Sequence, residues 1–414
     1  MNDMVVLGAG PESAALAAQL KARDFVDQTV GTAVIVWGAS ESNAWQINHV
    51  DDFEAAVLAG LGRYLDVLRA RELGGVNRIV NVVLNEGRGE LASTLCAVVG
   101  GLTRSWAREL ARHGATVNAV GYGGPDAALR AAEAVDFLAC ANAAYITGQS
   151  LGSVGQRLAD PRAKPSAPKA GPVLVSGGAG VIGAAITRGL HAAGRHVVVG
   201  YTREPVAREL VAGLDAPGRP CSMVHLDIAD PHSIDDAVRQ LSDGMMPTDL
   251  VVCGGWNRTA RFWDTNLEEG ARTLAINLTG PMRLLRDLSP VIDSAGGAVV
   301  GISSESARNG DPGRSVYAGA KAGLSRLLSH MHATSQGLVG ISVSPGPVDT
   351  PLMRVTHGDP ETAERAIEKI RMVVPMRRLG TPEEIAHGVV GALGHRGTFL
   401  GGEVLSIGGG TVMT

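Results

Sequence analysis

The strongest constraint on the fold is a regular alternation of short apolar runs with longer helical segments in the second half of the chain. The runs are continuously apolar, as expected of strands that are buried on both faces. This alternation predicts βαβ units and an open parallel sheet with helices on both sides. The seven expected strands are Val173–Val175, His196–Gly200, Met223–Leu226, Leu250–Cys253, Ala298–Ile302, Gly340–Val343 and Glu403–Ile407.

The first half repeats part of this plan with fewer strands. Its five expected strands are Met4–Leu7, Ala33–Trp37, Arg78–Leu84, Thr116–Val120 and Gln149–Val154. We interpret it as a shortened copy with one early βαβ section missing; the alternative is two unrelated α/β domains of similar composition. The prediction is therefore two Rossmann-like, doubly wound parallel-sheet domains, a degenerate one at 1–156 and a complete one at 171–414. A Pro-rich linker is expected at 157–170.

Composition excludes several classes of partner. The net charge is −4, which gives no reason to expect nucleic acid or an anionic membrane surface as a partner. We see no apolar stretch long enough for a transmembrane helix and no signal peptide. The four Cys are scattered and the 11 His form no ligand cluster, so we expect no metal site and a reducing, cytoplasmic location.

A glycine-rich turn between the first strand and first helix of the second half predicts a dinucleotide site. In this turn Gly177 permits the tight bend, Gly180 allows close approach of a pyrophosphate, and Gly183 lets the helix pack on the strand. The alternative is a helix start that merely tolerates glycine. The expected contacts with the phosphates are Ser176, Gly177, Gly180, Val181, Ile182 and Gly183.

The residues after the second strand favour NADPH over NADH. An acidic side chain there would bind the ribose 2′-hydroxyl of NADH, but the chain has Tyr201 and Arg203. The Arg203 guanidinium is suited to a 2′-phosphate, although a solvated loop arginine is the alternative. Asp227 and Ile228, after the third strand, are placed to meet the adenine ring.

A Tyr and a Lys lie four residues apart in a chain that has only five of each. Tyr317 and Lys321 share one face of a helix, and an ammonium near a phenol lowers its pKa. Ser304 comes 13 residues before Tyr317, at the end of the fifth strand, where its hydroxyl can hydrogen-bond a substrate carbonyl. The alternative for Tyr317 and Lys321 is an ordinary amphipathic surface pair.

With these motifs in place, residues 171–414 resemble the short-chain dehydrogenase/reductase family, and within it the 3-oxoacyl-[acyl-carrier-protein] reductases. The matching pieces include SGGAGVIG, NLTG, ISS, YAGAK, SPGPVDTP and GGEVLSIGGG. The resemblance implies that Tyr317 is the general acid, that Ser304 polarises the carbonyl, and that Lys321 holds the nicotinamide ribose. It also implies that Asn277 holds a water in a proton relay. The implied nicotinamide contacts are Pro345, Gly346, Val348 and Thr350.

The chain departs from the family pattern at several points. The segment after the fourth strand reads Cys253, Gly254, Gly255 and Trp256, and we expect the first three to contact the cofactor. No Lys or Arg occurs between Arg326 and Arg354, where relatives dock carrier proteins, so an acyl carrier protein is a partner in doubt.

The first half is similar to the inactive N-terminal copy found in the high-molecular-weight oxoacyl reductases. Aligned on the second half, the Tyr, Lys and Ser positions fall on Ala92, Cys96 and Leu84, and Ser13 replaces the third glycine of the turn. No proton donor remains, so we expect no redox chemistry from residues 1–156. Helices at Asp51–Glu72 and Glu90–His113 are expected to give an internal pseudo-dimer, within a homodimer of the whole chain.

The function that these features predict is reduction of a ketone by NADPH. The expected substrate is a 3-oxoacyl thioester or a polyketide-like ketone, small or carrier-bound. One alternative is an NAD(P)-dependent secondary-alcohol dehydrogenase for another small molecule. An alternative from a different class is a cofactor-binding scaffold without turnover. Residues from Met353 to Pro375 are expected to form a lid over the substrate.

Overall fold

The structure is a computed structural model, and it forms two compact units that are described separately below. The first unit comprises Met1–Ala163 with Met372–Arg378 and Gly409–Thr414, and the second comprises Lys164–Arg371 with Leu379–Gly408. The structure describes residues 5–7, 11–22, 32–37, 57–59, 61–63, 76–84, 90–122, 127–152, 171–214, 220–260, 264, 266–351, 353, 360–394 and 400–414. The predicted linker at 157–170 lies outside these residues.

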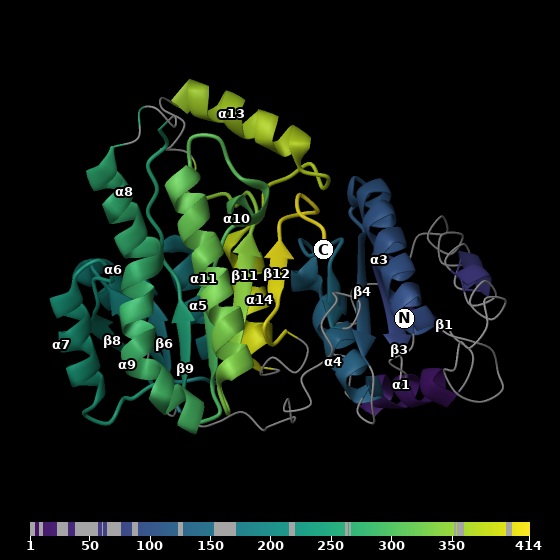
Figure 1. The fold of residues 1–414 in the computed structure, drawn as a ribbon, viewed down its shortest axis with the longest axis horizontal. Coiled ribbons are helices and arrows are strands. Elements are labelled where there is room, and N and C mark those ends of the chain that lie inside the picture. Colours follow the sequence, from purple (N-terminus) through teal and green to yellow (C-terminus); the bar gives the residue numbers. More distant parts are fainter. Residues whose placement is uncertain are drawn as a thin grey trace. The chain divides into compact units, whose positions relative to one another are not determined.

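The second unit is built on a parallel sheet of seven strands (Figure 1). The spatial order is β12-β11-β10-β9-β6-β7-β8, and each neighbouring pair is parallel. The strands are β6 (Val173–Ser176), β7 (Val197–Tyr201), β8 (Cys221–His225), β9 (Asp249–Val252), β10 (Ala298–Ile302), β11 (Val339–Pro345) and β12 (Val404–Ile407). All seven predicted strands are present, so the expected doubly wound fold is confirmed.

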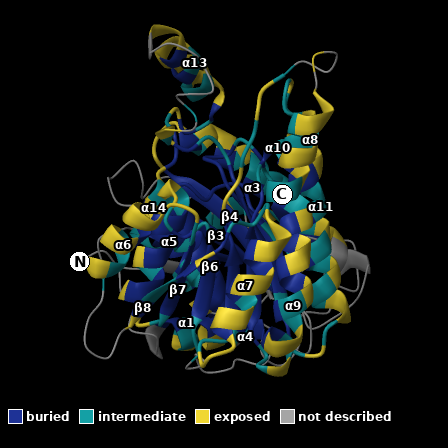
Figure 2. Ribbon diagram, turned by 90° about the vertical axis from the view of Figure 1, so that its left-hand side faces the viewer, coloured by how far each residue is buried: buried dark blue, intermediate teal, exposed yellow. Residues whose placement is uncertain are grey.

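Helices cover both faces of this sheet (Figure 2). The helices are α5 (Val181–Ala192), α6 (Glu204–Ala212), α7 (Pro231–Leu241), α8 (Leu267–Leu274), α9 (Gly280–Ser294), α10 (Ser306–Asn309), α11 (Ser315–Thr334), α13 (Pro360–Val373) and α14 (Pro382–Gly394). Helices α5, α6 and α14 lie on one side, whereas α9 and α11 lie on the other. On the α9 and α11 side, leucines of both helices interdigitate with every second residue of the strands and form a fully buried core.

The sheet reverses its strand order at β6. The chain passes outward from β6 to β7 and β8, and then returns to place β9 on the other side of β6. The helices that leave the adjacent strands β6 and β9 therefore diverge, and a crevice opens at the carboxyl ends of these two strands. Open α/β sheets bind their ligands at such a point.

The first unit holds a smaller parallel sheet of five strands, in the order β1-β2-β3-β4-β5. The strands are β1 (Val5–Leu7), β2 (Thr32–Trp37), β3 (Arg78–Leu84), β4 (Thr116–Tyr122) and β5 (Ser150–Gly152). Its helices are α1 (Pro11–Ala22), α3 (Glu90–Ala111) and α4 (Ala127–Ala139). The five predicted strands and the helix expected at Glu90–His113 are present; most of the helix expected at Asp51–Glu72 lies outside the described residues.

The two strand orders show what the first unit lacks. Removing β7 and β8 from the larger sheet leaves β6-β9-β10-β11-β12, which runs in chain order as β1-β2-β3-β4-β5 does. The missing section is thus the one that produces the reversal. The described strands of the small sheet therefore show no reversal of order, which is the feature that opens a ligand crevice in open α/β sheets.

The end of the chain belongs to the first unit rather than to the second. Gln149 donates from Nε2 to the Val412 carbonyl at 2.9 Å, and the Thr414 amide donates to the Gly148 carbonyl at 3.1 Å. The Tyr145 hydroxyl donates to the Arg378 carbonyl at 3.1 Å, while the Arg378 guanidinium stacks 4.6 Å from the Tyr145 ring centre. The predicted boundary at 171–414 differs here, because hydrogen bonds between segments distant in sequence cannot be read from local patterns.

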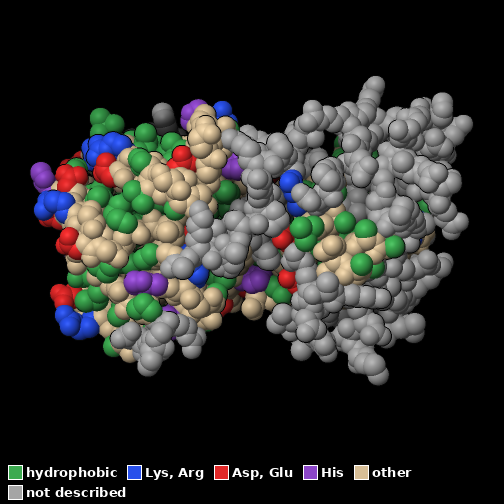
Figure 3. Space-filling view, turned by 90° about the horizontal axis from the view of Figure 1, so that it is seen from below, with side chains coloured by type: hydrophobic (Ala, Val, Ile, Leu, Met, Phe, Trp, Pro, Cys, Tyr) green, Lys and Arg blue, Asp and Glu red, His purple; other side chains and the backbone are tan. Residues whose placement is uncertain are grey.

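The surface of the second unit mixes charges of both signs. On the face shown in Figure 3, its basic, acidic and apolar side chains are interspersed without a broad patch of one kind. Among the described residues, no helix combines the length and apolar character needed to cross a membrane.

Candidate active site

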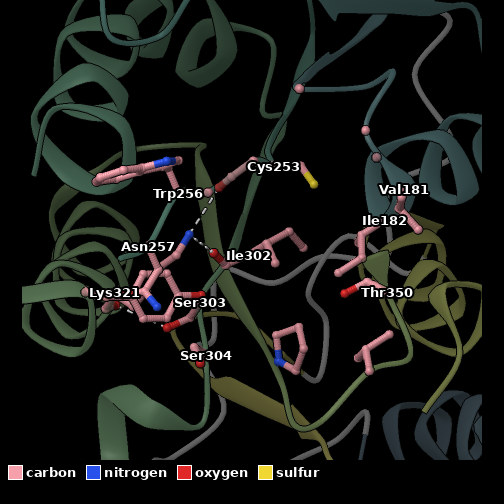
Figure 4. Close-up of a pocket in the computed structure, with 18 of the residues that line it drawn as sticks. Val181, Ile182, Cys253, Trp256, Asn257, Ile302, Ser303, Ser304, Lys321 and Thr350 are labelled. Atoms are coloured by element: carbon pink, nitrogen blue, oxygen red, sulfur yellow. Dashed lines mark hydrogen bonds between the residues drawn. The ribbon is translucent and has the colours of Figure 1, made fainter. Parts of the chain in front are cut away.

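The carboxyl ends of four strands enclose a cavity of about 320 Å³ (Figure 4). Residues from the loops after β6, β9, β10 and β11 form its walls. They are Gly177, Gly180, Val181, Ile182, Gly183, Cys253, Gly254, Gly255, Trp256, Asn257, Ile302, Ser303, Ser304, Arg314, Tyr317, Lys321, Pro345, Gly346, Val348, Thr350 and Met353. Fifteen of the predicted site residues are among them, and they converge from segments more than 170 positions apart in the sequence.

The glycine-rich turn has the geometry that its sequence predicts. Gly177 adopts a φ of +61°, which favours glycine, and a Cβ there would lie 2.7 Å from the Cys253 carbonyl oxygen. A Cβ on Gly183 would lie 2.1 Å from the Gly177 carbonyl oxygen, so only glycine lets α5 approach the turn this closely. The turn thus presents the backbone amides at the N-terminus of α5 to the cavity, and this cradle fits a pyrophosphate.

Ser176 supports the turn from behind. Its hydroxyl donates to the Cys253 carbonyl at 3.0 Å and accepts from the Cys253 amide at 3.1 Å. These two bonds tie the end of β6 to the end of β9. Ser176 is buried and is not among the residues that line the cavity, and its predicted contact with the cofactor stays a prediction.

The four residues predicted to bind the adenosine end lie outside the cavity. Arg203 is exposed at the N-cap of α6, and Tyr201 ends β7 with its ring edge-on to His225. Asp227 and Ile228 are partly exposed after β8, and the Asp227 carboxylate caps the Ala229 amide at 2.9 Å. The ligand contacts of these four residues stay predictions.

Ser304 and Tyr317 lie side by side in the wall of the cavity. Ser304 follows β10, Tyr317 lies in the first turn of α11, and their hydroxyls are hydrogen-bonded to each other. Burial raises the pKa of Tyr317, whereas the bond to Ser304 and then the positive charge of Arg314 lower it. The lowering that the sequence led us to expect from Lys321 therefore comes from Ser304 and Arg314 in this structure.

Lys321 is a buried residue of the cavity wall, one helical turn after Tyr317. Its ammonium donates to the Ile302 carbonyl at 2.8 Å and to the Gly254 carbonyl at 3.2 Å (Figure 4). The Nζ atom is 5.8 Å from the centre of the Tyr317 ring. Burial lowers the pKa of Lys321 to about 8, although the neighbouring Cys253 raises it slightly. Lys321 is thus held in a fixed position with a pKa close to neutrality, as suits a group that exchanges protons.

Asn277 lies behind Lys321 in a short π-helical stretch, Ala275–Thr279, between α8 and α9. Its Nδ2 donates to the Trp256 carbonyl at 2.7 Å and to the Thr273 carbonyl at 2.8 Å. The Oδ1 atom is buried, has no hydrogen-bond partner among the described residues, and faces Gly255, where a Cβ would lie 3.1 Å from this oxygen and 3.7 Å from Lys321 Nζ. An acceptor in this position is suited to a water molecule beside the ammonium.

Six cavity residues had not been predicted as site residues: Trp256, Asn257, Ile302, Ser303, Arg314 and Met353. Arg314 lies three positions before Tyr317 at the start of α11 and pairs with Asp311 at 3.1 Å. Its helical spacing from Tyr317 was a signal that sequence reasoning missed. Asn257 follows Trp256, which also lines the cavity with the Arg272 guanidinium 4.7 Å from its ring centre.

Comparison with known proteins agrees with this geometry. Residues 177–412 match the family model described as enoyl-(acyl carrier protein) reductase. This match covers more than half of the chain, which therefore belongs to this family of short-chain dehydrogenases/reductases and is an oxidoreductase acting between a carbonyl and an alcohol.

Particular relatives are reductases of oxoacyl groups. The chain is 30% identical to acetoacetyl-CoA reductase of Rhizobium meliloti over 57% of its length and 96% of the relative. It is 27% identical to a 3-oxoacyl-[acyl-carrier-protein] reductase of Synechocystis over 58% of its length and 96% of the relative. A solved blue fluorescent protein from a metagenomic library, in complex with NADPH, is 28% identical with a TM-score of 0.54, covering 60% of this chain and all of that one.

Proposed function

We propose that this chain is an NADPH-dependent ketoreductase that acts on a 3-oxoacyl thioester or a similar ketone. The observation that carries the proposal is the hydrogen-bonded pair of Ser304 and Tyr317 in a cavity that also contains the glycine turn of α5. A hydroxyl pair of this kind can hold a carbonyl oxygen and give it a proton, while the turn can hold a dinucleotide alongside.

Each residue then has one task. NADPH, when bound, supplies the hydride to the carbonyl carbon. Ser304 donates a hydrogen bond to the substrate oxygen, and Tyr317 transfers its phenolic proton to that oxygen as negative charge develops. Lys321 hydrogen-bonds the ribose with an ammonium that lies 5.8 Å from the centre of the Tyr317 ring. Ser304 and Arg314 stabilise the phenolate that Tyr317 becomes. The Asn277 Oδ1 atom holds a water that returns a proton through Lys321.

NADPH is favoured over NADH by the charge at the N-terminus of α6. Arg203 is exposed there, and Tyr201 takes the place in which an acidic residue would select a ribose hydroxyl. The NADPH complex of the metagenomic relative supports the same choice. The proposed contacts of Asp227 and Ile228 complete the adenine site.

The substrate class follows from the relatives and from the cavity. Two of these relatives are named for acetoacetyl-CoA and for a 3-oxoacyl group on a carrier protein, so a thioester with a 3-oxo group is the proposed substrate. Arg314 brings a guanidinium to the wall near Tyr317, and Met353 adds an apolar contact from the start of the proposed lid. The proposal covers an acyl group carried by coenzyme A or by a carrier protein.

The first unit is proposed to be a pseudo-enzyme. Cys96 stands at the position that corresponds to Lys321 and is 4% exposed inside α3, where it packs in the core. The small sheet also lacks the strand reversal that opens a nucleotide crevice. Its α3 helix (Glu90–Ala111) is proposed to pair with the second unit as an internal pseudo-dimer, within a homodimer of chains.

The test is oxidation of NADPH with acetoacetyl-CoA, comparing the native chain with Tyr317→Phe. We expect loss of about 10²- to 10⁴-fold in kcat, because the proton donor is removed while the ring remains. NADPH affinity, followed by nicotinamide fluorescence, is expected to stay within about threefold. Tyr122→Phe in the first unit is the matched control and is expected to leave kcat unchanged.

The alternative functions give different outcomes. Activity that survives Tyr317→Phe would refute the proposed acid, and NADPH binding without turnover of any ketone would indicate the scaffold. Turnover of a 2-enoyl thioester but not of the 3-oxo compound would point to the reaction in the family description. Reduction of NADP⁺ by an unrelated secondary alcohol, with no activity on thioesters, would favour the dehydrogenase.

A further inference from the structure

A buried carboxyl group lies directly beyond the reactive serine. Glu305 follows Ser304 at the end of β10 and is only 5% exposed. It is not part of the cavity wall, and the mechanism above does not use it. Burial of a carboxyl group is costly unless its oxygens are bound, so its position calls for a role.

The Glu305 carboxyl joins the end of β10 to the end of β12. The Ser406 hydroxyl in β12 donates a hydrogen bond to Glu305 Oε1. Ser406 is itself 2% exposed, so this bond is shielded from water on both sides. Hydrogen bonds to a carboxyl group in such surroundings are strong.

Two glycines leave the space that the carboxyl group fills. A Cβ on Gly408 would lie 1.9 Å from Glu305 Oε1 and 2.5 Å from its Cδ. A Cβ on Gly346 would lie 2.7 Å from Glu305 Oε2. Neither glycine has a positive φ, so conformational freedom does not explain them. The volume of Glu305 explains the lack of a side chain at Gly408, whereas at Gly346 the Gly408 Cα, 2.6 Å from an added Cβ, excludes a side chain as well.

The backbone continues the same connection. The Glu305 amide donates to the Pro345 carbonyl at 3.0 Å, and the Gly346 amide donates to the Ile407 carbonyl at 3.0 Å. The ends of β10, β11 and β12 are thereby held together past the last pairs of the sheet. Ser304, Pro345 and Gly346 line the cavity on the other side of this junction.

We propose that Glu305 is a positioning residue that sets Ser304 and the Pro345–Val348 segment relative to each other. Its carboxyl group acts as a rigid spacer between three strand ends, so that the carbonyl-binding hydroxyl and the predicted nicotinamide contacts keep one geometry. This proposal rests on the proposed function only where kcat is measured, because NADPH binding is measured separately.

The first experiment compares Glu305→Gln with Glu305→Ala. The amide of Gln preserves the shape and an acceptor for Ser406, so kcat and the NADPH dissociation constant are expected to change less than about threefold. The Ala variant removes the spacer, and kcat is expected to fall about 10- to 100-fold, as small misplacements of reacting groups do. NADPH affinity is expected to fall with it, while the pH profile of kcat keeps its shape. The reason is that burial, and after it Ser304, Arg314, Asp311 and Cys253, shift the pKa of Tyr317, and Glu305 is not among these causes.

The second experiment uses the glycine that Glu305 excludes. Gly408→Ala alone is expected to lower kcat, because its methyl group collides with the carboxyl group. In the Glu305→Ala background, Gly408→Ala is expected to lower kcat little further, since the carboxyl atoms nearest to its Cβ are absent. Gly346→Ala is the matched control: its Cβ would also lie 2.6 Å from the Gly408 Cα, so Glu305→Ala is not expected to rescue it.

Several results would overturn the proposal. These are an unchanged kcat and NADPH affinity in Glu305→Ala, a harmless Gly408→Ala in the native background, or equal effects of Gly408→Ala in both backgrounds. A loss of thermal stability in Glu305→Ala with no change in kcat would show a purely structural role. If the native chain reduces no ketone, the affinity of the same variants for NADPH still tests the positioning role of Glu305.

Discussion

Replacing Lys321 with Met tests whether the active-site ammonium is held at a cost to stability. Burial lowers the pKa of Lys321 from its ordinary 10.5 to about 8 in the folded chain. Between these two values the unfolded chain holds a proton that the folded chain has released. Stability therefore rises as the pH increases through this window, and the cost of the buried charge is fully present below pH 8.

The size of the effect follows from the gap between the two pKa values. A gap of about 2.5 pH units corresponds to about 3 kcal/mol, most of which is regained between pH 7 and pH 10. Lys321→Met removes this dependence. It also leaves the Ile302 and Gly254 carbonyls without their donor, but that loss is the same at every pH. The change with pH, rather than the value at one pH, isolates the buried charge.

Urea-induced unfolding, followed by circular dichroism at pH 7, 8, 9 and 10, measures this change. The stability of the native chain minus that of Lys321→Met is expected to increase by about 2 to 3 kcal/mol from pH 7 to pH 10. Lys369→Met, at an exposed position of α13, is the control and is expected to follow the native chain. Parallel curves for the native chain and Lys321→Met would refute the reasoning, because the ammonium would then cost nothing to bury.

Three further predictions concern the turn, the tail and the cofactor. Gly183→Ala is expected to weaken NADPH binding at least about tenfold in a fluorescence titration, because its Cβ would lie 2.1 Å from the Gly177 carbonyl oxygen. Gly319→Ala on α11 is the control, because an added Cβ there meets no atom within 4 Å. This control variant is expected to keep its affinity for NADPH and to gain about 0.5–1 kcal/mol of stability. Gln149→Ala removes the buried bond to the C-terminal tail, so hydrogen exchange in the first unit is expected to speed up, with a cost of about 1–3 kcal/mol; unchanged protection would contradict this role. Arg203→Ala is expected to raise KM for NADPH about tenfold and to leave KM for NADH within about twofold, and equal changes for both cofactors would contradict the proposed 2′-phosphate contact.

Local patterns predicted most of the framework. Continuous apolar runs indicated the strands of both sheets, because a strand that is covered on two faces needs apolar side chains at every position. The Gly177–Gly183 spacing predicted the turn, since steric limits on a backbone act within a few residues. Tyr317 and Lys321 were found as a pair because helical spacing fixes which side chains share a face.

Other features depend on residues that are distant in sequence. Ser304 and Arg314, rather than Lys321, lower the pKa of Tyr317, because electrostatic effects depend on distance and burial in the folded chain. The i,i+4 spacing predicted that Tyr317 and Lys321 share one face of a helix. It could not predict the Gly254 and Ile302 carbonyls, which accept hydrogen bonds from the Lys321 ammonium.

The sequence by itself therefore determined the class of fold, the glycine-rich turn and the pairing of Tyr317 with Lys321 on one helix, since each is encoded within a few turns of helix or one strand. Only the tertiary structure decided that Glu305 fills the space of two glycines, and that the C-terminal tail belongs to the first unit. These features arise from close packing and hydrogen bonding between residues 41 to 263 positions apart, for which no local pattern of residues carries a signal.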